Sequence, residues 1–157
     1  MIIIGEKING AIPSIKQAIA EKNETLIVER TLAQVAAGAD FLDCAPSTAT
    51  EIEYDTMVWL IGLMQGCTDT RLCIDSPNAR LLARIIEEGH VARPGMVNSV
   101  NEEGDKCETI FPLIAGTPWE VVGLTCDQGG TPADPVKKVD IAKRIIDKAA
   151  KYGVALS

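Results

Sequence analysis

Residues 71–89 read RLCIDSPNARLLARIIEEG, and this stretch decides the fold. It begins with a short apolar run from Arg71 to Asp75, which is typical of a buried β-strand. Ser76-Pro77 then matches the start of a helix, because Ser caps a helix N-terminus and Pro fits its first turn. Apolar residues follow at helical spacing as far as Gly89, which predicts the end of that helix. The stretch therefore predicts one strand–helix unit, with Asp75 at the carboxyl end of the strand.

The same arrangement recurs on both sides of this unit. Further strands are predicted at 2–4, 39–43, 95–98 and 121–125. Helices are predicted over 25–37, 51–65 and 105–115, and from Asp134-Pro135 to Gly153, with Pro112 expected to kink or shorten the third of these. Repeated strand–helix units imply parallel strands joined by right-handed crossovers. The chain is therefore predicted to be an α/β protein with five such units.

Two of these helices have apolar residues that predict a buried face. In the helix over 51–65, the expected core contacts are Ile52, Trp59, Leu60 and Leu63. In the last helix they are Val139, Ala142, Ile146 and Ala149. In the last helix the spacings of three and four residues are those of one side of a helix.

The residues at the strand ends distinguish between two architectures, a closed eight-stranded barrel and an open doubly wound sheet. The first strand is not followed by G-x-G-x-x-G, which removes the main support for a dinucleotide fold. Polar residues follow or end every predicted strand, in the order Glu6 and Asn9, Asp43, Asp75, Asn98, and Asp127. In a barrel these ends converge on one mouth, where barrel enzymes place their chemistry. The pattern therefore favours the barrel.

The composition fits a core of aliphatic side chains. Hydrophobic residues make up 46% of the 157 residues and aromatic residues only 4%, and the net charge of −7 offers no basic surface for nucleic acid. Neither a signal peptide nor a membrane-spanning run is recognisable. The five cysteines include no C-x-x-C pair, and His90 lacks partners at zinc-ligand spacing. We expect a cytoplasmic protein with free thiols, no metal, no membrane association and no nucleic-acid partner.

The length holds five units, whereas a barrel needs eight. A half-open sheet leaves an edge and an apolar interior facing water. Residues 154–157 match the approach to a sixth strand. We therefore expect residues 1–157 to form a single barrel domain that stops before the sixth strand. It would be a fragment, or a half-barrel completed by a partner or by a second copy.

Five motifs together resemble the methyltetrahydrofolate:corrinoid methyltransferase family. They are IIGEKING at 3–10, LCIDS at 72–76, MVNSVN at 96–101, FPL at 111–113 and VGLT at 122–125. They occur in the family's order and spacing over essentially the whole chain. The wider superfamily of pterin-binding proteins includes the folate module of cobalamin-dependent methionine synthase and dihydropteroate synthase.

The resemblance implies a TIM (β/α)8 barrel of the pterin-binding type, of which this chain supplies about the first five units. It implies that Asp75 and Asn98 hydrogen-bond the pterin ring of tetrahydrofolate or methyltetrahydrofolate. The implied reaction is methyl transfer between N5 and the cobalt of a corrinoid (cobalamin) carried by a partner protein, and a homodimer is expected. Asn98 is the candidate catalytic residue, because its carbonyl oxygen could stabilise a protonated N5. Glu6, Asn9 and Asp43 are further candidates for pterin binding.

Two departures from the family pattern leave alternatives open. The family's Asp-x-Asn-x-Gly-Pro after the second strand here reads DCAPS at 43–47, so Ala45 replaces the Asn, and a sixth-strand Asp lies beyond this sequence. A dihydropteroate synthase is an alternative, although its Arg after the second strand is absent here, where Ala49 follows Ser47-Thr48. A non-catalytic half-barrel that serves binding or assembly is the other alternative.

Each candidate also has a structural interpretation. Asp75 could help to cap the following helix, and Asn98 could be a turn residue. Glu6, Asn9 and Asp43 could form hydrogen bonds within the mouth. Asp127, followed by Gln128-Gly129-Gly130, is predicted to form a turn.

Overall fold

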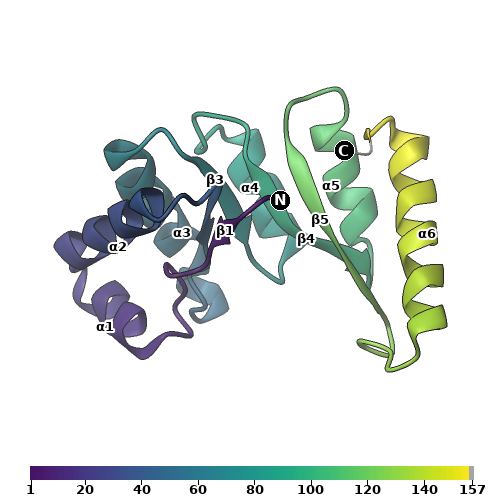
Figure 1. The fold of residues 1–157 in the computed structure, drawn as a ribbon, viewed down its shortest axis with the longest axis horizontal. Coiled ribbons are helices and arrows are strands. Elements are labelled where there is room, and N and C mark those ends of the chain that lie inside the picture. The colour runs from purple at the N-terminus through teal and green to yellow at the C-terminus, as the bar shows by residue number, and fades with distance from the viewer. Residues whose placement is uncertain (156–157) are drawn as a thin grey trace.

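The computed structural model describes residues 1–155 and contains five strands and six helices, which alternate except that α1 and α2 are consecutive. In chain order they are β1 (Ile4–Gly5), α1 (Pro13–Glu21), α2 (Glu24–Ala36), β2 (Phe41–Cys44), α3 (Thr50–Cys67), β3 (Arg71–Asp75), α4 (Ala79–Glu87), β4 (Met96–Glu102), α5 (Lys106–Ile114), β5 (Glu120–Asp127) and α6 (Pro135–Tyr152). The strands form one sheet in the order β1-β2-β3-β4-β5, and every neighbouring pair is parallel. The sheet curls into a half-barrel with helices along its outer side (Figure 1). The predicted fold is confirmed as the first five βα units of a TIM barrel.

The two faces of the sheet carry two separate apolar clusters. Side chains alternate between the faces of a strand, so Leu42, Ile74 and Val97 point toward the helices and join the main core. The opposite, inner face holds a smaller cluster of Phe41, Cys73, Met96 and, partly buried, Ile4 and Val122. Both faces of the central strands are thus apolar, as in other parallel sheets covered by helices.

The fourth strand is longer than predicted. It continues past Asn98 as far as Glu102. The register between β4 and β5 shifts between Val97 and Val100 and again before Glu102, which marks bulges in the ladder. Asn98 therefore lies within a strand and not in a turn.

The helix after β3 begins later than predicted. Its N-cap is Asn78, whose side chain accepts hydrogen bonds from the backbone amides of Arg80 and Leu81. Ser76 instead accepts from the Asn78 amide, forming a short turn before the helix. The prediction of Ser76 as the cap was wrong by two residues, because Asn is an equally good cap.

The predicted helix faces were only partly right. In α6 the buried residues are Ile141, Ile145 and Ala149, whereas Val139 is 52% and Ile146 40% exposed. In α3 Leu60 is buried as predicted, but Ile52 is 54% exposed. Apolar residues surround both helices on more than one side, so spacing alone could not select the buried side. The first helix, α1, was not predicted.

Other local predictions agree with the structure. Asp134 caps α6 by accepting from the Val136 amide at 2.9 Å, and Pro135 is its first residue. All five cysteines are free. Within residues 1–155, every helix is too short or too polar to cross a membrane. Residues 156 and 157, at the predicted approach to a sixth strand, lie outside the described residues.

Candidate functional site

The inner face of the half-barrel is arranged in layers along the strands. Asp75 pairs with Asn98 across β3 and β4, and Asp43 pairs with Cys73 across β2 and β3, so all four side chains point to the inner face. Asp75 and Asn98 lie one layer above Cys73 and Met96, toward the carboxyl ends of the strands, and Asp43 lies level with Cys73. The inner face thus has an apolar floor beneath a polar mouth.

The opposite end of the same face is closed by Arg71. Its guanidinium donates to Glu120 Oε1 at 2.7 Å and to the carbonyl oxygens of Pro94 at 2.9 Å and Pro118 at 3.1 Å. It also lies over the Phe41 ring at 4.5 Å. The Arg71 side chain reaches from β3 across the start of β4 to the start of β5. Its positive charge is therefore paired with Glu120, far from the mouth.

Asp43 is the most deeply buried polar group of the mouth. The residue is 1% exposed, and its Oδ1 has no hydrogen-bond partner among the described residues. Burial, followed by the nearby charge of Asp75, raises the pKa of Asp43 to about 7, and polar contacts from Asn98 and Cys73 offset part of that rise. Near neutral pH this carboxyl therefore exists in both protonated and ionised forms.

Asp75 is half-buried and faces two other acids. Burial raises the pKa of Asp75, and the charges of Glu6 and Glu53 raise it further. Glu53 is a buried residue of α3, and its Oε1 accepts from Ser76 Oγ at 2.6 Å. The Ser76 amide in turn donates to the carbonyl oxygen of Asn98 at 3.3 Å. These bonds fix the turn that follows Asp75 against both α3 and β4.

Glu53 was not predicted from the sequence, although it carries one recognisable signal. It shares a helix face with the buried residues Met57, Leu60 and Ile61, at the spacings of i+4, i+7 and i+8. A charged residue on an otherwise apolar helix face needs a polar partner when buried. Ser76 is that partner.

We expect Glu53→Gln to lower the pKa of Asp75, because the amide can keep a hydrogen bond to Ser76 while the negative charge is removed. Carboxyl 13C NMR titration of the folded chain measures this directly. Glu51→Gln, on the exposed side of the same helix, is the matched control and should leave Asp75 unchanged. An Asp75 titration identical in both variants would contradict the assigned charge contact.

Glu6 and Asn9 lie in the loop after β1 and differ in their roles. Glu6 is exposed, and its charge acts on both Asp43 and Asp75, so it borders the mouth. Asn9 uses its Oδ1 to accept from the Ala11 amide at 2.8 Å and from Ser47 Oγ at 3.2 Å. Asn9 therefore links the loops after β1 and β2, which gives it a structural role, and its contact with a pterin stays a prediction.

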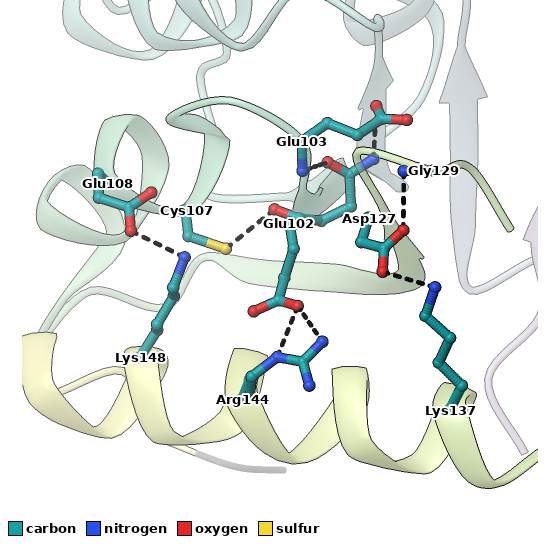
Figure 2. A network of polar contacts seen from close by, with 10 residues as sticks. Glu102, Glu103, Cys107, Glu108, Asp127, Gly129, Lys137, Arg144 and Lys148 are labelled. Atoms are coloured by element: carbon teal, nitrogen blue, oxygen red, sulfur yellow. Dashed lines mark hydrogen bonds and ion pairs between the residues drawn. The ribbon is translucent and has the colours of Figure 1, made fainter. Parts of the chain in front are cut away.

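Asp127 belongs to a different group of contacts at the ends of β4 and β5. Its carboxylate accepts from the Gly129 amide at 2.9 Å and pairs with Lys137 at 3.2 Å, which confirms the predicted turn. Figure 2 shows three acids facing three basic residues of α6, in the pairs Asp127 with Lys137, Glu102 with Arg144, and Glu108 with Lys148. These ion pairs fasten α6 to the sheet and leave Asp127 outside the mouth.

The remaining hollows and thiols offer no chemistry comparable with the mouth. A cleft of about 670 Å³ between β5, α5 and α6 is mainly apolar and contains none of the candidate residues. Burial raises the pKa of the Cys44 and Cys73 thiols, so both remain protonated at neutral pH. Within residues 1–155, no three His, Cys, Asp or Glu side chains are grouped as metal ligands.

No family model matches the chain. A methylcorrinoid:tetrahydrofolate methyltransferase of Eubacterium limosum is 43% identical over 156 residues, which are 98% of this chain and 57% of that protein. The predicted family resemblance is confirmed. The matched region is the N-terminal part of that relative. Methionine synthases of Mycobacterium leprae and Mycobacterium tuberculosis are each 27% identical over 161 residues, which are 98% of this chain and 13% of each synthase. The chain thus spans only part of the length of each relative.

Proposed function

We propose that this chain forms one wall of the tetrahydrofolate site of a corrinoid-dependent methyltransferase. In the proposed reaction a methyl group passes between N5 of tetrahydrofolate and the cobalt of a corrinoid on a partner protein. The observation that carries the proposal is the pairing of Asp75 with Asn98 at the mouth, in a chain that is 43% identical to a methylcorrinoid:tetrahydrofolate methyltransferase. The two residues occupy the positions that the family resemblance assigns to pterin binding.

The chemistry of the mouth supports a pterin as the ligand. A pterin edge presents an amino group and ring N–H donors beside acceptors, and a carboxylate such as Asp75 can accept from two donors at once. Asn98 can both donate and accept. The apolar floor of Phe41, Cys73 and Met96 suits a flat ring, as in other pockets that combine apolar walls with a few polar groups. We assign Asn98 to the approach to N5.

The opposite wall of the site would come from further βα units. The outer edge of β5 is unpaired among the described residues, and an additional parallel strand would pair there. We propose that such units, from a longer polypeptide or from another chain, supply the remaining pterin contacts. A homodimer is the expected assembly, and the mass of the protein in solution checks it.

We expect Asp75→Asn and Asn98→Ala each to weaken tetrahydrofolate binding by about 30- to 100-fold, or roughly 2–3 kcal/mol, because each leaves buried ligand donors unpaired. Isothermal titration calorimetry measures the affinity for tetrahydrofolate, both in residues 1–157 and in the full-length natural protein that contains them. Asp69→Asn is the matched control, because the Asp69 side chain is 97% exposed and lies just before the start of the same strand. Equal affinity in all three variants would overturn the pocket assignment.

A further inference from the structure

Asp43 differs from the other acids of the mouth in its surroundings. It is buried on the inner face, level with Cys73, with Oδ1 unpartnered. None of the ion pairs within residues 1–155 includes it. The contacts from Asn98 and Cys73 offset only part of the cost of burying an ionised carboxylate in such a place. The protonated form avoids that cost.

The groups that act on Asp43 come from β3, from β4 and from the loop after β1. On β3 they are Asp75 and the neutral thiol of Cys73, on β4 the amide of Asn98, and after β1 the carboxylate of Glu6. Cys44, the next residue of β2, is also neutral. The charged groups in this set are all acidic, so each of them favours the protonated form of Asp43.

A carboxyl with these properties fits a step that the proposed reaction requires. When N5 of tetrahydrofolate attacks the methyl group, the new N–C bond forms from the N5 lone pair, and the methyl–cobalt bond breaks with its electron pair remaining on cobalt. N5 then carries one proton too many and must release it. In the reverse direction, N5 must gain a proton before it can leave the methyl group. The same residue must therefore both accept and donate a proton.

We propose that the carboxyl group of Asp43 accepts the proton released by N5 on methylation and returns it in the reverse direction. This inference rests on the proposed function. Oδ1 of Asp43 has no partner among the described residues, and the Asn98 amide, which we assign to the approach to N5, lies beside Asp43. A group that titrates near the working pH is the most effective for exchange in both directions. Asp75, which has a second acid from α3 beside it, serves to bind the pterin edge.

Proton uptake during binding of 5-methyltetrahydrofolate tests this inference. Calorimetric titrations of the full-length natural protein that contains these residues, in two buffers of different ionisation enthalpy, give the number of protons exchanged. For the wild type we expect little uptake at about pH 6 and an approach to one proton at about pH 8, because Asp43 must be protonated to face N5. In Asp43→Asn the uptake should disappear, whereas the affinity at about pH 6 should change by less than about tenfold.

The variants separate this inference from the proposed function. Asp75→Asn should lose affinity, and at high ligand concentration it should keep the proton uptake. Circular dichroism checks that each variant is folded.

If the wild type binds no 5-methyltetrahydrofolate, the proposed function fails and this inference fails with it. If binding persists and Asp43→Asn takes up protons as the wild type does, only the role of Asp43 is overturned. A 13C titration of the free chain in which Asp43 ionises below about pH 5 would overturn it as well.

Discussion

Asp43→Asn should make the protein more stable than the wild type at pH 8, and the advantage should shrink as the pH falls. The pKa of Asp43 is about 7 in the folded chain and 3.8 in the absence of its surroundings. Between these values the unfolded chain has released the proton and the folded chain still holds it. The free energy of unfolding of the wild type therefore falls as the pH rises through this window. Asn cannot ionise, so the variant avoids this loss.

The expected size follows from about 1.4 kcal/mol for each pKa unit, which gives roughly 3 kcal/mol between about pH 5 and pH 8. Urea unfolding of both proteins at several pH values measures the difference. Asp69→Asn, at an exposed site, should follow the wild type at every pH. If the wild type and Asp43→Asn gave parallel profiles, Asp43 would not be the buried acid described above.

Gly95→Ala should destabilise the protein by about 3 kcal/mol or more, or prevent folding, because the new methyl group has no room. A Cβ at Gly95 would lie 2.1 Å from the carbonyl oxygen of Leu72. That oxygen belongs to the backbone of β3 and cannot move without disturbing the ladder between β3 and β4. The Gly95 carbonyl also accepts from the Glu120 amide at 2.9 Å, so a shift would extend to β5.

Gly62→Ala supplies the matched control for this variant. Gly62 lies within α3, and a Cβ there meets no atom within 4 Å. Because Ala favours a helix over Gly by about 1 kcal/mol, this variant should be neutral or slightly more stable. Thermal unfolding measures the melting temperature of both variants. Equal melting temperatures would show that β3 and β4 can separate at Gly95 and would contradict this prediction.

The order of the strands could be predicted because it follows from local patterns. Each strand–helix unit is visible in a short stretch such as 71–89, and right-handed crossovers place successive strands side by side. The adjacency of Asp75 and Asn98 follows from this order. The order does not predict that Asp75 and Asn98 lie at the same level in the sheet, because register depends on contacts between strands. The bulges in β4 also leave no mark in the sequence.

The environment of Asp43 could not be predicted from the sequence either. Its strand continues to Cys44, and the loop after it, at Ala45 and Pro46, is also buried. Gly10 permits this arrangement, because a Cβ there would lie 2.0 Å from the Pro46 carbonyl oxygen. The packing of one loop against another next to a buried acid is a long-range effect, and helical or strand periodicity carries no information about it.

The bonds made by Arg71 bear on how a barrel of this kind could be assembled. A side chain from β3 that reaches across the start of β4 to Glu120 draws the first and last of these three strands toward each other on one face. Arg71 and Glu120 thus hold the bend of the sheet from within β3 and β5. The bend therefore does not depend on closure of the barrel. Any polypeptide that adds a strand to β5 would meet an edge already set at an angle. If further βα units complete the barrel as proposed, pairing at this edge would cost little rearrangement of the sheet.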